Sequence, residues 1–217
     1  MALTVVIVYC RGPMMHIRID AERLDPRKIQ PALEGLRRGE VIIYPSDTGY
    51  AFACALTSSR GMAALRRLKG LHAKHLKPLT MMVENLNAIG RYGAMSNEAF
   101  RVVRRLLPGP YTIVLRATGD VPRAMKNRAH EIGMRMPEHP VCRALLDGLG
   151  EPLITGSVSP GEDEPELEEP EFFESRYGND VFAFLDSGPL WPEPSTVLRF
   201  EGAEIEVLRA GQGPIPA

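Results

Sequence analysis

Apolar residues follow two different periods along this chain, and the period predicts the local structure. Between positions 26 and 39, Ile29, Leu33 and Leu36 recur every three or four residues, which predicts a helix with one apolar face. The next apolar run, residues 41–44, lies between a glycine and a proline and predicts a short buried strand. These two segments therefore predict a helix that leads directly into a strand.

The same two patterns recur to the end of the chain. Further helices are predicted over residues 59–70, 96–106 and 139–149. Further strands are predicted over residues 51–56, 79–83, 111–115, 132–137, 152–157, 181–185, 196–200 and 205–208. Because helices and strands alternate and no internal repeat is present, the predicted class is α/β with a mixed sheet.

The 217 residues fit a single large domain with a short extension. Residues 1–14 are interpreted as an accessory or poorly ordered N-terminal extension, and residues 15–217 as the domain. There are two other interpretations: residues 2–10 form an extra strand, or translation starts near Met15. Residues 162–174 are strongly acidic and contain two prolines. A solvated loop or a short acidic helix is preferred there over a binding element.

Charge and cysteine content narrow the functional classes. The formal net charge is -1, which argues against a strong nucleic-acid binder but leaves a local basic patch open. Three widely spaced cysteines indicate reduced thiols in a cytoplasmic protein, with Cys54 and Cys142 expected in the core. The five histidines do not lie at metal-ligand spacing, so no metal site is predicted. No apolar run is long enough to cross a membrane.

Polar residues follow the strand at 41–44 and form the first candidate site. The segment Pro45–Tyr50 carries Ser46, Thr48 and Tyr50 where a strand of the sheet ends, which is where α/β proteins bind ligands. On composition alone, a turn that closes the strand is the favoured interpretation. The segment Leu106–Thr112 contains Pro-Gly-Pro and is assigned mainly a structural role.

A single arginine lies between apolar neighbours in the predicted strand at residues 132–137. Strand alternation points Arg135 away from Met134 and Met136, so it requires an anionic partner. A structural ion pair is the commoner case, and a fork for a ligand carboxylate or phosphate is the alternative. Downstream, the small residues of 155–161 form a turn whose amides can hold phosphate, although the signal is weak by itself.

Taken in order, these segments resemble the YrdC/YciO family, which includes the threonylcarbamoyl-adenylate synthases. The resemblance runs from about Pro26 to Gly213. Its family elements are P-T-D/E-T-x-Y, L-x-P-G-P-hydrophobic-T, G-hydrophobic-R-hydrophobic-P, S-T-V and R-x-G. They match residues 45–50, 106–112, 133–137, 195–197 and 209–211. No Rossmann fingerprint or P-loop is present to bind a nucleotide in another way.

The resemblance implies a fold, a reaction and a site. The fold is a twisted mixed sheet flanked by helices, with a concave, positively lined cavity. The reaction joins L-threonine, bicarbonate and ATP, used with Mg²⁺, into threonylcarbamoyl-AMP for the t6A modification of tRNA. By matching position, Ser46, Thr48 and Tyr50 hold threonine and its carbamate, and Lys69 and Arg135 act in catalysis. The nucleotide-binding part of the site is lined by Ser157, Ser159, Ser195 and Arg209.

Two motifs depart from the synthase pattern. Where the synthases have K-x-R-P-x-x-x-P-L, this chain keeps Lys69 but has Leu71 at the arginine position and a longer loop carrying His72, Lys74 and Lys77. Where they have T-S-A-N, residues 156–159 read G-S-V-S, so the asparagine amide is replaced by the hydroxyl of Ser159. Both departures make the chain more similar to the YciO branch of the family.

Two functions besides a nucleotidyltransferase remain open from the sequence. The first alternative is a non-catalytic module of the same fold that binds a nucleotide, tRNA or other double-stranded RNA. The second is a carbamoyl-transfer role, like that of family domains fused within hydrogenase-maturation proteins.

Overall fold

One mixed β-sheet organises the molecule in the computed structural model, which describes residues 13–70, 79–125, 129–158, 170–190 and 193–216. Its strand order is β1-β9-β2-β3-β8-β4-β7-β6-β10-β11, and β5 pairs with β6 outside this path. The strands are β1 (Met15–Arg18), β2 (Ile42–Ser46), β3 (Gly49–Ala55), β4 (Thr80–Met82), β5 (Gly93–Ala94), β6 (Tyr111–Ala117), β7 (Glu131–Arg135), β8 (Leu153–Ser157), β9 (Ala183–Asp186), β10 (Thr196–Glu201) and β11 (Glu204–Arg209). The predicted mixed sheet is confirmed.

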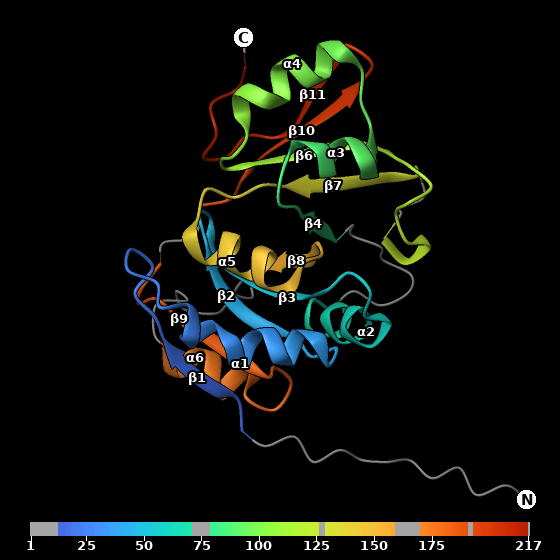
Figure 1. The fold of residues 1–217 in the computed structure, drawn as a ribbon. Coiled ribbons are helices and arrows are strands. Elements are labelled where there is room, and N and C mark those ends of the chain that lie inside the picture. Colours follow the sequence, from blue (N-terminus) through green and yellow to red (C-terminus); the bar gives the residue numbers. More distant parts are fainter. Residues whose placement is uncertain (1–12, 71–78, 126–128, 159–169, 191–192, 217) are drawn as a thin grey trace, which may run out of the picture.

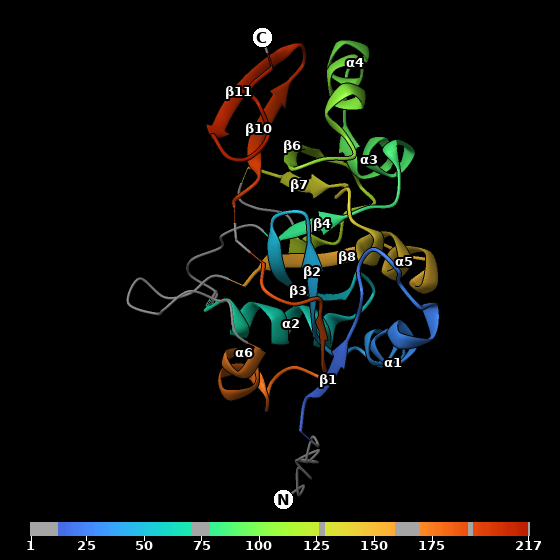
Figure 2. The same cartoon turned by 90° about the vertical axis from the view of Figure 1, so that its left-hand side faces the viewer.

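Helices cover the sheet and close its two hydrophobic cores (Figures 1 and 2). They are α1 (Pro26–Arg37), α2 (Ser59–Leu68), α3 (Leu86–Tyr92), α4 (Asn97–Leu106), α5 (Pro140–Leu149) and α6 (Pro170–Tyr177), with a 3-10 turn at Arg123–Met125. Helices α1 and α5 pack against each other over one core. Helices α2, α3, α4 and α6 contribute buried residues to the other core.

Strand β2 shows how the sequence builds both cores at once. Ile42 and Tyr44 belong to the core under α1 and α5, whereas the intervening Ile43 belongs to the second core. Successive side chains of a strand point to opposite faces, so an uninterrupted apolar run is what a strand buried on both faces requires. The short apolar run seen in the sequence therefore marks the centre of the fold.

The predicted helices and strands are found within a few residues of their expected ends, whereas strands β1 and β5, helix α3 and the 3-10 turn were not predicted. Helix α3 is short and follows β4 after residues 83–85, with Asn85 as its N-cap. Helix α6 takes up the end of the acidic segment and buries Phe173, which agrees with the short-helix interpretation for residues 170–174. Residues 162–169, the N-terminal residues 1–12 and Trp191 lie outside the described residues.

The segment Pro45–Tyr50 forms the tight connection between β2 and β3. Ser46 pairs with Gly49, so only Asp47 and Thr48 lie between the two strands. Gly49 has a φ of 102°, a conformation that side chains with a Cβ rarely adopt. The predicted strand-closing turn is thus a two-residue hairpin turn, which projects Asp47 and Thr48 from the end of the sheet.

Two features of the composition have simple structural outcomes. Cys54 and Cys142 are buried and free, as expected for small core residues. Among the described residues, no helix combines the length and the apolar character needed to cross a bilayer.

We expect the start of α5 to be sensitive to acid through His139. Its Nδ1 accepts the backbone N–H of Val141 at 3.3 Å, and burial lowers the pKa of this imidazole. The unfolded chain then binds the proton more readily, so the stability that His139 contributes is complete above pH ~6.5 and is lost as the pH falls further. A cap is worth about 1 kcal/mol.

Thermal unfolding between pH 7.5 and 5 tests this expectation. His139→Asn keeps an N-cap acceptor that does not titrate, so its melting temperature should fall less on acidification than that of the wild type. His130→Asn, at an exposed position, serves as the matched control and should keep the wild-type slope. Equal slopes for His139→Asn and the wild type would contradict the assignment.

Candidate functional site

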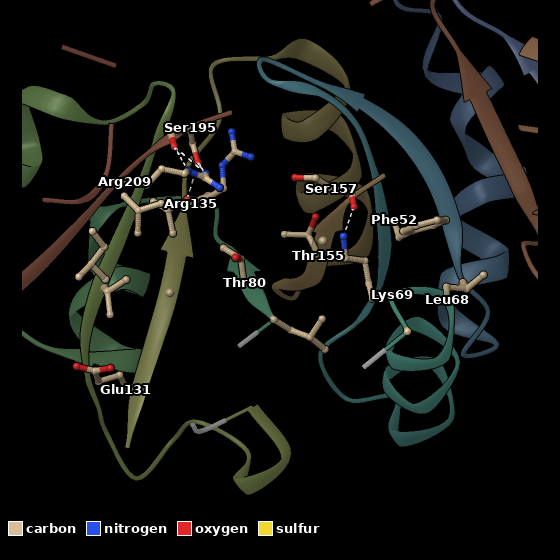
Figure 3. Close-up of a pocket in the computed structure, with 18 of the residues that line it drawn as sticks. Phe52, Leu68, Lys69, Thr80, Glu131, Arg135, Thr155, Ser157, Ser195 and Arg209 are labelled. Carbon is tan, nitrogen blue, oxygen red and sulfur yellow. Dashed lines mark hydrogen bonds between the residues drawn. The ribbon is translucent and has the colours of Figure 1, made fainter. Parts of the chain in front are cut away.

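A cleft of about 860 Å³ opens between the two halves of the sheet. Figure 3 shows Arg135, Ser195 and Arg209 on one wall, Lys69, Leu68 and Phe52 on the other, and Thr80 and Thr155 between them. The first wall is made by strands β6, β7, β10 and β11, and the second by β3, β8 and the end of α2. Residues that are far apart in the sequence, from Phe52 to Arg209, therefore meet in one cavity.

Arg135 is the most strongly held cation of the cleft. Its Nη2 donates to Asp47 Oδ1 at 2.6 Å and its Nη1 donates to Thr48 Oγ1 at 2.8 Å, across from β7 to the β2–β3 turn. The residue is 7% exposed, and its Nε has no hydrogen-bond partner among the described residues. Both terminal nitrogens of the guanidinium thus bind protein groups, which agrees with the interpretation of Arg135 as part of a structural ion pair.

Burial also perturbs the carboxyl group that holds this arginine. Desolvation raises the pKa of Asp47, while the charge of Arg135 and a backbone N–H of Glu138 act to lower it. Burial therefore disfavours the charged form of Asp47, and the charge of Arg135 favours it. Loss of either residue would leave the charge of the other buried and uncompensated.

Arg209 lies beside Arg135 and is held by Ser195. Its Nε and Nη2 donate to the Ser195 carbonyl oxygen at 3.0 and 2.7 Å, and Nη2 also reaches Ser195 Oγ at 3.1 Å. Burial lowers the pKa of Arg209, and the nearby charge of Arg135 lowers it further. Two guanidinium groups held close together repel each other, so an anion bound between them would be stabilised.

Lys69 supplies the cation of the opposite wall. It follows α2 as the C-cap residue, and its Nζ donates to the Ser157 carbonyl oxygen at 2.5 Å. A Cβ at Gly156 would meet Lys69 Cδ at 3.3 Å, so the glycine lets this side chain lie along the end of β8. The cleft thus has cations on both walls, about a centre lined by hydroxyl groups.

The predicted threonine-binding residues lie outside the lining of this cleft. Ser46 Oγ donates to the Gly49 carbonyl oxygen at 2.7 Å, and so it holds the hairpin turn. Tyr50 donates to the Gly188 carbonyl oxygen at 2.7 Å, and its ring packs against Phe173 and Phe184. Burial raises the pKa of Tyr50 to about 12. Thr48 is linked to the lining because its Oγ1 accepts a hydrogen bond from Arg135.

The structure brings five of the predicted site residues together in the cleft. Lys69, Arg135, Ser157, Ser195 and Arg209 line the cleft together. Ser159 and the loop at 71–78, with Leu71, His72, Lys74 and Lys77, lie outside the described residues. The hydroxyl groups of Thr80, Thr112 and Thr155 and the carboxylate of Glu131 were not predicted.

Strand alternation was the signal that could have identified the missed residues. Glu131 and Gly133 share the cleft-facing side of β7 with Arg135, because alternate residues of a strand point to the same side. Thr112 lies in a segment assigned mainly to structure, yet its Oγ1 is 2.9 Å from Ser195 Oγ. Among the described residues, no group of three or more histidine, cysteine, aspartate or glutamate side chains could hold a metal ion.

Comparison with known proteins adds relatives of both family branches. The model of the Sua5/YciO/YrdC family, described as "Telomere recombination", matches residues 34–211. YciO of Escherichia coli (strain K12), itself described as uncharacterized, is 35% identical over 191 residues, which cover 87% of this chain and 91% of YciO. A threonylcarbamoyl-AMP synthase of Mus musculus is 27% identical over 192 residues, which cover 85% of this chain and 64% of the synthase.

Two solved structures share the fold. The crystal structure of E. coli YciO aligns with a TM-score of 0.81 at 32% identity, covering 93% of this chain and 96% of that chain. The crystal structure of P. abyssi Sua5 complexed with L-threonine aligns with a TM-score of 0.77 at 22% identity, covering 91% of this chain and 57% of that chain.

We expect Asp47→Asn to destabilise the protein because it leaves the charge of Arg135 buried and uncompensated. Removing one partner of a buried ion pair costs about 3–5 kcal/mol. Adding Arg135→Met removes the orphaned charge as well, so the double variant should be more stable than the sum of the two single losses implies. Urea denaturation of the four proteins in this double-mutant cycle measures the coupling.

The exposed pair Arg143–Asp147 on α5 provides the matched control. Its Nε–Oδ2 distance is 2.8 Å, but both side chains are more than half exposed, so the same kind of cycle should show almost no coupling. If the free energies of unfolding for Asp47→Asn and Arg135→Met are simply additive, the buried pair does not join the two parts of the sheet as described.

Proposed function

This chain belongs to the Sua5/YciO/YrdC family, and we propose that its cleft binds ATP, L-threonine and bicarbonate and forms threonylcarbamoyl-AMP. The observation that carries the proposal is that Arg135 and Arg209 lie close together on one wall of a cleft whose opposite wall carries Lys69. Three cationic groups around one cavity suit a reaction whose substrates are all anionic or zwitterionic. The relatives named as threonylcarbamoyl-AMP synthases support the same reaction.

The chemistry consists of two steps. The amino group of threonine adds to bicarbonate and loses water, which gives the carbamate. An oxygen of the carbamate then attacks the α-phosphorus of ATP, and the bond from that phosphorus to the bridging oxygen breaks as pyrophosphate leaves. Such a transfer needs little covalent help from the protein, because close placement of the reactants and neutralisation of their charge supply most of the rate.

The residues of the cleft divide these tasks between its two walls. Arg209, with Ser195 and Thr112, would hold the phosphate that is attacked, and the buried guanidinium of Arg135 would add its positive charge beside it. Lys69 would face the carboxylate or the departing pyrophosphate from the other wall. Asp47 and Thr48 would act as positioning residues, since they orient Arg135.

Mg²⁺ would enter with the nucleotide. No cluster of metal ligands occurs among the described residues, so the ion would be held chiefly by the phosphate oxygens of ATP. Its contribution is to neutralise charge on the leaving pyrophosphate. We propose that the product is used in the cytoplasm for the t6A modification of tRNA.

Loss of Arg209 should impair this reaction far more than it impairs folding. Removing one group that stabilises developing charge costs on the order of 10²–10³-fold in rate, so we expect Arg209→Met to lose at least 100-fold in pyrophosphate release. Arg209→Lys keeps the charge but not the fork and should recover part of the rate. The assay combines ATP, threonine and bicarbonate and detects the adenylate by mass spectrometry.

The outcomes of this assay separate the candidate functions. Arg143→Met, on the exposed side of α5, is the control and should match the wild type. Threonine-independent ATP binding without pyrophosphate release would favour the non-catalytic module. In that case, tRNA or double-stranded RNA binding that weakens steeply with salt would identify an RNA-binding protein. A wild-type protein that binds neither ATP nor threonine would refute the proposed synthase.

A further inference from the structure

A second cavity, of about 600 Å³, lies apart from the cleft. It opens where the connections that follow β3, β4 and β6 meet the start of β8, and none of the described residues that line it also lines the cleft. Part of the lining is aliphatic: Leu56, Ala88, Pro122 and Pro152. The same described lining carries three carboxylates: Glu84, Asp120 and Glu151. This combination suits a ligand that has both methylene groups and positive charge.

Two of the three carboxylates have no cationic partner among the described residues. Asp120 Oδ2 accepts a hydrogen bond from Arg91 Nε at 2.9 Å, so its charge is compensated. Glu151 accepts the backbone N–H and the hydroxyl group of Thr57 at 3.0 and 2.9 Å, and both of these donors are neutral. Glu84 Oε1 meets a neutral side-chain amide at 3.5 Å. A ligand with two positive charges would therefore compensate the two carboxylates that remain.

The hydroxyl group of Tyr92, the last residue of α3, belongs to the same cavity. Tyr92 is 4% exposed and lines the cavity, yet its hydroxyl group has no hydrogen-bond partner among the described residues. That oxygen is not enclosed by protein atoms, so it faces the cavity. Burial raises the pKa of Tyr92, the charge of Arg91 lowers it, and the three carboxylates of the cavity raise it further. A buried tyrosine normally has a hydrogen-bond partner, and here that place is open to a ligand.

We propose that this cavity binds an aliphatic diamine or polyamine, whose ammonium groups pair with Glu84 and Glu151 and whose methylene groups lie on the aliphatic lining. The Tyr92 oxygen accepts a hydrogen bond from one of the ammonium groups. An ammonium group has three N–H donors and no acceptor, so it can bind a carboxylate and a phenol oxygen at the same time. A phosphate or carboxylate ligand would instead be repelled by the uncompensated negative charge. The site is independent of the reaction proposed for the cleft.

Titration of the nucleotide-free protein with putrescine, followed by NMR of the backbone amides, tests the site. Saturable shifts should appear in residues 84–92 and 151–152, and binding should weaken as NaCl is added, because salt screens exposed charges. Butylamine carries one charge in place of two, so it should bind roughly 5-fold more weakly than putrescine. Glu84→Gln should weaken putrescine binding by about 3–5-fold, which corresponds to one partly exposed charge pair.

Glu22→Gln is the matched control, because it removes the same charge from an exposed position outside the cavity and should keep the wild-type affinity. Tyr92→Phe should weaken putrescine binding about twofold and leave urea denaturation unchanged, because the hydroxyl group has no hydrogen bond within the protein to lose. Equal affinities of Glu84→Gln and Glu22→Gln, or of the wild type for putrescine and butylamine, would overturn the site. Tighter binding of a Lys-Lys dipeptide than of putrescine would also overturn it, and would assign the cavity to the lysines of a partner protein.

Discussion

The ion pair between Asp47 and Arg135 is the interaction on which the site depends. It ties the β2–β3 turn to β7 at a distance of 2.6 Å, and these elements lie on the two sides of the cleft's central strands β8 and β4. Both side chains are about nine-tenths buried, so the pair exists only where water is largely excluded. In such surroundings the partners must match in charge and geometry, because an unpaired charge is costly. The requirement makes the relative placement of the two parts of the sheet a condition of stability as well as of the geometry of the cleft.

The same pair changes what Arg135 can do in a reaction. Asp47 compensates its charge and Thr48 occupies its second amino group, so a ligand in the cleft would meet a rigid, partly neutralised guanidinium. Among the described residues, Arg209 has no comparable carboxylate partner, because Ser195 binds it through neutral oxygens. Burial and the charge of Arg135 both lower the pKa of Arg209, because both disfavour its positive charge. A bound phosphate would compensate that charge. Preorganised cations of this kind stabilise charge at no cost of reorganisation during the reaction.

Local patterns predicted most of the fold because each strong element is encoded by neighbouring residues. Helix α1 begins at Pro26 after the Asp25 cap and buries Ile29, Leu33 and Leu36, as its spacing indicates. Strand β1 and helix α3 were missed because they contain only four and seven residues, too few to establish a period. The hairpin turn at Pro45–Tyr50 was recognised as a turn, but the partners of its side chains come from positions more than 85 residues away.

The sequence by itself determined the class of fold, the positions of the main helices and strands, and the ordered motifs that resemble the YrdC/YciO family. Those features depend on local periodicity and on the spacing of residues within short motifs, both of which can be read directly from the sequence. Only the tertiary structure decided that Arg135 meets Asp47 and Arg209, that Ser46 and Tyr50 hold the hairpin and its surroundings, and that Glu131 joins the cleft. The physical reason is that charge pairing and burial depend on distances in space, and β3, β8, β4, β7, β6, β10 and β11 become neighbours only through long-range pairing in the sheet.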